Sequence, residues 1–443
     1  MIVNKIFSQT QSLCPVCLKK LDAVIITQGK SYIMKKTCPV HGDFRTTVWK
    51  GSTPMEKWKL TKQRAFITRP LTEVREGCPY DCGLCSAHRQ HTCTALIEVT
   101  QRCNLNCRFC FADSKNSSND PAVEEINALY ECVLDASGVC NIQLSGGEPT
   151  LRDDLPQLIK NGKNLGFKFI QVNTNGIRLA EDESFVEELK SAGLDSIYLQ
   201  FDGTEDLIYQ KLRGKALLST KIKAIENCEK HGIGVVLVPT LVPNVNVNNI
   251  GKIIDFALEH IQAVRGVHFQ PVSYFGRIPK PPLDDDRITL GELMDEIEKQ
   301  TDGKIRASSL RPPQCENSFC SFHGRFLMQA NGELLALEGG SDCCVKKAEE
   351  GAIKAKVYVS KNWASRQEEK HSAATTDDSW DKILRSIQNK SFGLSAMAFQ
   401  DAWNVDLNRV MDCCIHVASP DGKLIPFCLY NLTDTEGNAL YRK

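Results

Sequence analysis

Three closely spaced cysteines are the residues of this chain best able to do chemistry. Cys103, Cys107 and Cys110 form a C-x₃-C-x₂-C pattern directly after the apolar run Ala95–Thr100. That run predicts a β-strand, so the thiols fall on the loop at its carboxyl end. Thiolates select zinc, copper(I) or iron–sulfur clusters. Three of them can hold three irons of a cubane and leave the fourth iron open, as a catalytic metal centre requires.

A second motif, Ser145-Gly-Gly-Glu-Pro149, follows the next predicted strand, and Phe109 precedes the last cysteine. With the cysteines, these residues resemble the radical S-adenosylmethionine (SAM) superfamily. The resemblance implies a 4Fe-4S cluster on the three thiols, whose free iron binds SAM and whose electron cleaves it to methionine and a 5′-deoxyadenosyl radical. It assigns to the SAM site Phe109, Gly146, Gly147, Glu148 and Pro149, with the glycines letting the backbone approach the SAM ammonium. A zinc knuckle or unrelated cysteines are the alternative, which leaves the Gly-Gly-Glu-Pro run unexplained.

The elements that must position these motifs alternate between strand and helix from about residue 95 to 275. The pattern predicts strands at Ala95–Thr100, Asn141–Leu144, Phe167–Val172, Ser196–Phe201, Gly234–Thr240 and Gly266–Val272. It predicts helices at Val123–Asp135, Leu155–Leu165, Ser184–Ala192, Leu218–Lys230 and Asn248–His260, then Leu290–Gln300. Repeated βα units indicate an α/β fold with a parallel sheet. Six units are fewer than the eight of a closed barrel and match the partial (β/α)6 barrel of radical SAM cores.

Ligands of a parallel α/β sheet gather at the carboxyl ends of its strands. Polar residues that follow the later strands are therefore candidate SAM contacts: Asn173, Asn175, Asp202, Arg213 and Thr240. The Asn-x-Asn-Gly run at residues 173–176 also suits an ordinary turn. Its place in the series of strand ends favours a binding role.

The first segment, residues 1–65, carries four metal-ligand residues: Cys14, Cys17, Cys38 and His41. A C-x₂-C pair and a C-x₂-H pair supply four ligands for one tetrahedral ion. The alternation between Leu21 and Met34 predicts a short hairpin between the pairs. We interpret the segment as a zinc-ribbon or rubredoxin-like module with zinc or iron, in which metal binding supplies much of the folding energy. A structural role is favoured, and a redox role is the alternative.

Residues 66–94 hold a second C-x₃-C-x₂-C pattern, formed by Cys78, Cys82 and Cys85. It follows no predicted strand and has no Gly-Gly-Glu-Pro partner, which favours an auxiliary iron–sulfur cluster over a second SAM site. Zinc is the alternative. The fourth ligand could be Cys93, His88 or a distant cysteine.

The core is expected to end near residue 300, and the C-terminal auxiliary region spans 301–443. A further cluster could use some combination of Cys315, Cys320, Cys414 and Cys428, and the alternative is that several of these are small buried apolar residues. Each adjacent pair, Cys343-Cys344 and Cys413-Cys414, is expected to supply one ligand at most. Residues 345 to about 380 are polar and predict a mobile excursion.

Composition narrows the function classes. Lys+Arg and Asp+Glu both total 54, so no basic excess indicates a nucleic-acid partner. The N-terminus lacks the apolar region of a signal peptide, and the longest apolar run, Ile233–Val242, is too short to span a bilayer. Twenty cysteines in metal-like spacings then predict a reducing cytoplasm and several metal centres rather than disulfides.

The run Gly77–His88, followed closely by Ile97–Ala112, is similar to one subfamily, the tetraether lipid synthase-like radical SAM proteins. The ending Ile425–Asn431 extends that resemblance. It implies hydrogen abstraction from an unactivated carbon, coupling of lipid chains, one or two auxiliary clusters, reduced ferredoxin or flavodoxin as electron donor, and peripheral membrane contact. A radical methyltransferase acting on a pterin and a peptide-modifying maturase are the alternative enzymes. A cluster-carrying electron-transfer protein is the non-enzyme alternative.

Overall fold

A parallel sheet forms the centre of the molecule. The computed structural model describes residues 5–114, 120–337, 346–364 and 390–442. Six parallel strands adjoin one another in chain order: β6 (Thr94–Thr100), β7 (Asn141–Gly146), β8 (Ile170–Thr174), β9 (Ser196–Gln200), β10 (Gly234–Val238) and β12 (Val264–Pro271). Short β11 (Thr240–Leu241) pairs with the end of β12. The predicted alternation of strands and helices in an α/β core is confirmed.

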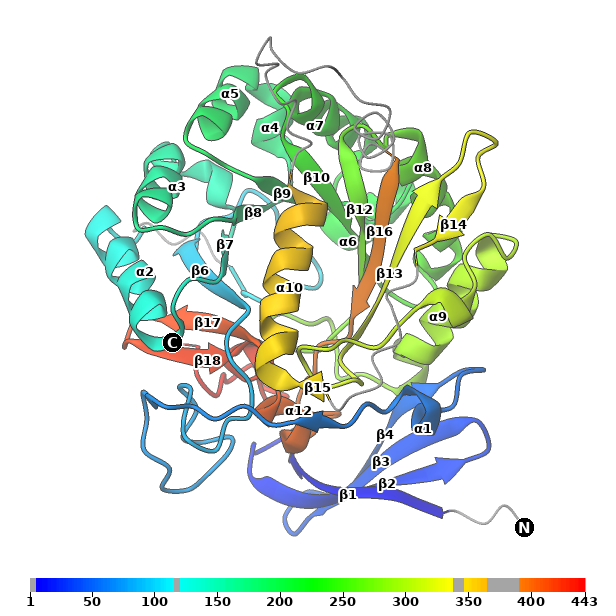
Figure 1. Cartoon of the computed structure of the whole chain (residues 1–443). Helices are drawn as coiled ribbons and strands as arrows, with labels where there is room; N and C mark the ends of the chain where they lie inside the picture. The colour runs from blue at the N-terminus through cyan, green and yellow to red at the C-terminus, as the bar shows by residue number, and fades with distance from the viewer. Residues whose placement is uncertain (1–4, 115–119, 338–345, 365–389, 443) are drawn as a thin grey trace.

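Helices connect these strands and cover the outer face of the sheet (Figure 1). They are α2 (Val123–Ser137), α3 (Leu155–Asn164), α4 (Ile177–Glu181), α5 (Glu183–Ser191), α6 (Asp206–Arg213), α7 (Leu218–Lys230), α8 (Ile250–Glu259) and α9 (Leu290–Gln300). Helix α8 buries Ile250, Ile253, Ile254 and Ala257, the three- and four-residue spacing of one helix face. Strand residues alternate accordingly, since Val235 faces the helices and Val236 faces the interior of the curved sheet.

The C-terminal third extends the same sheet at both edges. Strand β16 (Ser391–Met397) pairs in parallel with β12, and β13 (Ser321–Met328) and β14 (Leu334–Ala336) follow as antiparallel strands. At the opposite edge, β17 (Ile415–Ser419) pairs in parallel with β6, and β18 (Lys423–Pro426) pairs with β17. Strands β13, β14, β16, β17 and β18, all beyond residue 300, therefore extend the core sheet.

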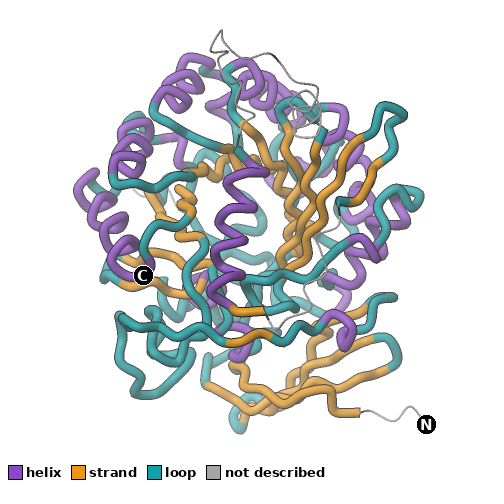
Figure 2. The backbone as a smooth tube through the Cα atoms, in the orientation of Figure 1, coloured by secondary structure: helices purple, strands orange, loops and turns teal. Residues whose placement is uncertain are grey.

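Part of the segment predicted to be a mobile excursion is a sixteen-residue helix, α10 (Ala348–Trp363). Figures 1 and 2 show it lying across the inner side of the sheet, where it contacts β7, β10 and β12. Small residues permit this approach, because a Cβ on Gly351 would lie 2.2 Å from the backbone oxygen of Gln314. The prediction was wrong here because the apolar face of α10 is narrow. Residues 365–389 and the Cys343-Cys344 pair lie outside the described residues.

The N-terminal module is an antiparallel sheet of β1 (Lys5–Leu13), β2 (Lys20–Gln28), β3 (Ser31–Cys38) and β4 (Gly42–Lys50). The predicted hairpin is its middle pair. Lys36 joins the module to the C-terminal region, because its buried Nζ donates to Ser12 Oγ (3.0 Å) and to the backbone oxygen of Ala402 (2.7 Å). Burial lowers the pKa of Lys36 to about 7.

Short elements complete the described chain: α1 (Met55–Trp58), β5 (Lys62–Gln63), β15 (Lys346–Lys347), α12 (Leu407–Met411) and α13 (Phe427–Asn431). Strands β5 and β15 pair in parallel, outside the main sheet. Within the described ranges, every helix is too short or too polar to cross a bilayer.

Candidate active site

The loop after β6 places the three predicted cluster cysteines in the wall of a cavity of about 480 Å³. Backbone hydrogen bonds fix this loop, with Arg108 N donating to Leu212 O (3.0 Å) and Cys110 exchanging two bonds with Arg277 (3.1 and 2.9 Å). All three thiols line the cavity and form no disulfide, and burial raises the pKa of Cys103 to about 11. Cys107 is buried, whereas Cys103 and Cys110 are half-buried.

These thiols fit a cluster better than a single ion. Sulfurs on one tetrahedral zinc ion lie within about 4.6 Å of one another, twice the metal–sulfur bond length. In the described structure, the sulfurs of Cys103, Cys107 and Cys110 do not all lie within 4.8 Å of one another. The ligand atoms of two other groups do, namely those of the N-terminal module and those of Cys93, Cys315 and Cys414. Three separated thiols at the mouth of a cavity suit three irons of a cubane.

The side chain of Glu148, in the Gly-Gly-Glu-Pro motif, makes hydrogen bonds that hold the fold together. Its buried carboxylate accepts bonds from Thr150 N (3.2 Å) and Thr150 Oγ1 (2.7 Å), and from Thr174 Oγ1 and Asn175 N (both 2.6 Å). Four protein donors already occupy this carboxylate, so it ties the end of β7 to the end of β8. Pro149 begins the short 3₁₀ turn that follows.

Neighbouring backbone leaves no room for side chains at the two glycines of that motif. A Cβ on Gly146 would lie 2.1 Å from Thr100 O, and one on Gly147 would lie 2.1 Å from Arg102 O. The two glycines therefore let the loops after β6 and β7 pack together, and their role in the approach of SAM stays a prediction.

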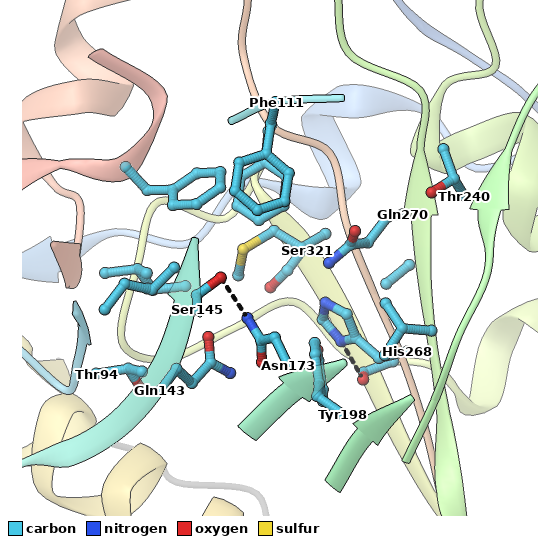
Figure 3. Close-up of a pocket in the computed structure, with 18 of the residues that line it drawn as sticks. Thr94, Phe111, Gln143, Ser145, Asn173, Tyr198, Thr240, His268, Gln270 and Ser321 are labelled. Carbon is cyan, nitrogen blue, oxygen red and sulfur yellow. Dashed lines mark hydrogen bonds between the residues drawn. The ribbon is translucent and has the colours of Figure 1, made fainter. Parts of the chain in front are cut away.

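The two asparagines after β8 have different surroundings. Asn175 is buried, accepts a bond from Ile177 N and donates to Asn104 Oδ1 (2.7 Å), so it braces the cysteine loop. Asn173 donates to Ser145 Oγ (3.3 Å), and its buried Oδ1 has no partner within the described structure. That orphaned acceptor faces the cavity (Figure 3), where a bound ligand can satisfy it.

Asp202 and Arg213 form a buried ion pair below the cysteine loop. Arg213 donates twice to the carboxylate at 2.7 Å, and their side chains are 0% and 5% exposed, respectively. Arg213 also donates to Thr240 Oγ1 (3.1 Å) and reaches Cys107, while Thr240 N donates to Asp202 (3.2 Å). Lys221, unnoticed in the sequence, is fully buried beside them and donates to Asn175 O. Arg213 and Lys221 therefore bring two cationic side chains close to Cys107, one of the predicted cluster ligands.

The middle of the cavity carries a polar group of which the sequence indicated only Gln270, at the end of the sixth predicted strand. Gln143 on β7, Tyr198 on β9, and His268 and Gln270 on β12 face the interior (Figure 3). His268 Nδ1 lies 2.8 Å from Ser395 Oγ, and burial lowers the pKa of the ring to about 3, so it is neutral. These four residues share no sequence motif, so only the pairing register of the parallel strands could have shown that their side chains lie together.

The predicted ligands of the N-terminal module come together. The ligand atoms of Cys14, Cys17, Cys38 and His41 lie within 4.8 Å of one another, which fits one tetrahedral ion. Backbone N–H groups of Val40 and His41 lower the pKa of Cys38 to about 6, so its metal-binding thiolate forms readily.

A second compact group joins Cys93, Cys315 and Cys414, with all three sulfurs within 4.8 Å and buried. Cys93 and Cys414 sulfurs are 3.0 Å apart, and the Glu316 carboxylate lies 3.6 Å from Cys414. Hydrogen bonds from Cys315 and Cys414 hold the pKa of Cys93 well below its usual range. The group lines the same cavity as the cysteine loop, and its three sulfurs fit a metal centre.

This grouping corrects the predicted combination of C-terminal cysteines. Cys320 and Cys428 lie instead around buried Arg409, whose Nη2 is 3.5 Å from Cys320 Sγ. Cys413 lies near them, whereas its neighbour Cys414 belongs to the other group. The expectation that an adjacent pair gives at most one ligand to one site therefore agrees with the geometry.

Cys78, Cys82 and Cys85 are neighbours, and a hydrogen bond from Cys82 lowers the pKa of Cys78. Neither suggested nearby fourth ligand joins them. Cys93 is in the compact group described above, and His88 Nε2 bonds the backbone oxygen of Cys413 (2.7 Å). The Tyr441 hydroxyl also lies beside this group, where it accepts a hydrogen bond from Cys82 N (3.0 Å).

Known proteins match the chain at several levels. Residues 97–257 match the radical SAM superfamily, and residues 6–50 match the HMPTM N-terminal zinc ribbon domain. The 7,8-dihydro-6-hydroxymethylpterin dimethyltransferase of Methanocaldococcus jannaschii is 38% identical over 472 residues, covering 96% of this chain and 93% of that protein. A probable GTP 3′,8-cyclase of Methanococcus aeolicus is 30% identical over 220 residues, covering 48% of this chain and 70% of the cyclase.

Among solved structures, Streptococcus suis SuiB bound to S-adenosylmethionine is 20% identical, with a TM-score of 0.40, and the match covers 48% of each chain. None of these matches supports the predicted tetraether lipid synthase-like subfamily. The relation to the pterin enzyme spans nearly both proteins, and the superfamily match covers the cysteine loop and the strands that follow it. The chain is therefore a member of the radical SAM superfamily, whose enzymes use a 4Fe-4S cluster and SAM.

Proposed function

We propose that this radical SAM enzyme methylates a dihydropterin-type heterocycle. The observation that carries the proposal is the 38% identity, over 96% of this chain, to the pterin dimethyltransferase of M. jannaschii. The zinc-ribbon match over residues 6–50 extends that relationship into the N-terminal module.

The cavity supports a flat, polar heterocycle. The orphaned Oδ1 of Asn173 and the amides of Gln143 and Gln270 offer donors and acceptors of the kind that pair with ring nitrogens and amino groups. Neutral His268 adds one more polar contact, and the Tyr198 ring, 5.5 Å from His268, offers an aromatic surface for stacking. A pterin held there would lie between the cysteine loop and the Cys93 group, both of which line the cavity.

The chain's own residues would position the reacting partners. When bound, the cluster supplies the electron that cleaves SAM to methionine and a 5′-deoxyadenosyl radical, which abstracts hydrogen from the substrate carbon. Cys103, Cys107 and Cys110 would hold the cluster, and the strand-end loops would orient SAM. The row of polar side chains would hold the substrate carbon near the radical, and positioning of this kind is the main protein contribution in such chemistry. The cavity wall would exclude water from the reactive species.

Isotope transfer tests the proposal. Anaerobic enzyme with reconstituted clusters would receive reductant, SAM carrying a labelled methyl group, and 7,8-dihydro-6-hydroxymethylpterin deuterated on its side chain and ring carbons. Deuterium in 5′-deoxyadenosine together with a methylated pterin is expected. If the labelled methyl group of SAM appears in the pterin, SAM is the methyl donor. If the pterin gains an unlabelled methyl group when a folate-type one-carbon carrier is present, that carrier is the donor. Deoxyadenosine without deuterium and without methylated pterin would refute the proposal.

Matched variants separate substrate binding from SAM cleavage. His268→Phe should raise the KM for the pterin while uncoupled formation of deoxyadenosine continues. Cys107→Ala should abolish deoxyadenosine formation altogether. His260→Phe, on the far side of the sheet at the end of α8, is the control and should change neither quantity.

A second candidate, coupling of lipid chains, is favoured by one observation. The cluster end of the cavity is walled by aromatic rings, among them Phe111, Phe275, Phe399 and Phe427, with Phe399 and Phe427 centroids 4.4 Å apart. An apolar wall of this kind also suits an alkyl chain. The same assay decides between the two, because a deuterated lipid extract would then label 5′-deoxyadenosine and the pterin would not.

A further inference from the structure

Arg265 is a buried cation that enters the interior of the sheet through a β-bulge. In the pairing of β10 with β12, Val235 is opposite Val264 and Val236 is opposite Gly266, so Arg265 is the extra residue. A bulge redirects the side chain of the inserted residue. A Cβ on Gly234 would lie 2.6 Å from the backbone oxygen of Trp363 and 3.0 Å from Arg265 Cγ, so the bare glycine lets both the end of α10 and the Arg265 side chain approach β10.

The guanidinium of Arg265 lacks the anion that its burial requires. The residue is 5% exposed, and its Nε and Nη1 have no hydrogen-bond partner within the part of the chain that is described. The charged group that acts on it is Arg325, whose own Nε is also buried and unpartnered. Burying an unpaired charge is strongly unfavourable, and buried donors without partners are rare in native proteins. The buried Arg265 and the half-buried Arg325 beside it, both with unpartnered buried donors, therefore indicate a place for an anion.

The surrounding groups are also hydrogen-bond donors. Arg325 on β13 pairs directly with Gly393 on β16, and Gly266 pairs with Gly393 from the other side. A Cβ on Gly393 would lie 3.7 Å from the Arg265 backbone oxygen, 3.8 Å from the Tyr358 hydroxyl and 3.9 Å from Trp363 Nε1. A phenol and an indole that can donate hydrogen bonds therefore lie beside the bare backbone of Gly393, whose strand partners are Arg325 and the residue after Arg265.

We propose that Arg265, Arg325, Tyr358 and Trp363 form a binding site for a phosphate group. Paired guanidinium groups match the charge and the several oxygens of a phosphate better than those of one carboxylate. Tyr358 and Trp363 line the same cavity as Cys103. Arg265 stands at the amino end of β12, whereas the cysteine loop follows the carboxyl end of β6. A ligand that spans the cavity would bind its phosphate at one end and present its reacting carbon at the other.

Phosphate binding to the holoenzyme tests this site without any turnover, so the result does not depend on the methylation proposed above. Titration calorimetry under nitrogen, in phosphate-free buffer, would use orthophosphate and glycerol 1-phosphate as separate probes. One saturable site per chain is expected. Arg265→Met and Arg325→Met should each weaken binding about tenfold or more, the usual loss for a hydrogen bond to a charged group. Arg306→Met, at an exposed arginine, should leave the affinity unchanged.

Thermal unfolding gives a second measurement. Phosphate should raise the Tm of the wild type and leave that of Arg265→Met unchanged, because only the wild type gains a partner for its buried charge. Tyr358→Phe provides a test if Arg265→Met fails to fold, because it keeps both arginines. This variant should bind phosphate more weakly than the wild type does. Binding of glycerol 1-phosphate at least as tight as that of orthophosphate identifies a phosphate ester as the ligand, and binding of orthophosphate alone identifies the free ion. Equal affinities of wild type and both arginine variants, or no saturable binding to the wild type, would overturn the proposal.

Discussion

Replacing Arg213 with Met should loosen the end of β9 and helix α6, because the Asp202 carboxylate would stay buried without its counter-charge. Arg213 donates to both carboxylate oxygens at 2.7 Å, and neither side chain is more than 5% exposed. Within the described structure, Thr240 N also donates to that carboxylate, at 3.2 Å. Breaking a buried hydrogen-bonded pair from one side costs about 3–5 kcal/mol. At about 1.4 kcal/mol per factor of ten, the local opening equilibrium should rise about 100- to 4,000-fold.

Hydrogen–deuterium exchange with mass spectrometry, performed under nitrogen, measures that opening. Amides of residues 196–213 should exchange faster by this factor, while the N-terminal sheet keeps its protection. The control is Lys252→Met. Lys252 pairs with Glu205 at the same 2.7 Å, but these side chains are 64% and 52% exposed. Such a pair contributes less than about 1 kcal/mol, so exchange should change little.

The double variant Asp202→Asn/Arg213→Met removes both charges and should recover most of the lost protection. The reasoning would fail if Arg213→Met exchanged no faster than Lys252→Met. It would also fail if the double variant were as open as the sum of the two single variants, because the pair would then have no coupling energy.

Three further predictions concern metal and pH. Cys38→Ser should release one metal ion per chain and unfold the N-terminal module, seen by elemental analysis and by proteolysis confined to residues 5–50. Cys414→Ala should change the metal content of the Cys93 group while Cys413→Ala does not, and equal losses in both variants would contradict the separate grouping. The pKa of His268 falls from its ordinary value to about 3 on folding, so its contribution is complete above pH 6.5 and is lost as the pH falls toward 3. Wild type should therefore lose about 1 kcal/mol more than His268→Gln between pH 6.5 and 5.5 in anaerobic urea unfolding, because the unfolded histidine goes from half to almost fully protonated over that interval.

The fold of the core could be predicted because local patterns and global architecture agree there. Helix α9 runs over the predicted residues Leu290–Gln300, where its apolar positions repeat every three or four residues. The strands from β6 to β12 differ from their predicted bounds by a few residues at most ends. Helix α10 was missed because Ala348, Gly351 and Ala352 bury little apolar surface, and the pattern depends on close backbone approach rather than on hydrophobicity.

The grouping of the cysteines could not be predicted, because it depends on strand pairing across most of the chain. Cys93 precedes β6 and Cys414 precedes β17, and the parallel pairing of those strands joins residues 321 positions apart. No local spacing encodes that distance. The four ligands of the N-terminal module, by contrast, are separated by a single hairpin, and their grouping was predicted.

The addition of C-terminal strands to both edges of the sheet has a consequence for synthesis on the ribosome. When β12 has emerged, β6 and β12 are still edge strands, and their partners β17 and β16 have yet to be made. At typical translation rates of about 5–20 residues per second, β17 follows β12 by roughly 7–30 s. During that interval two unpaired strand edges can template pairing with other chains. The nascent protein should therefore depend on chaperones that shield those edges, and a ribosome stalled before β16 should hold an aggregation-prone sheet.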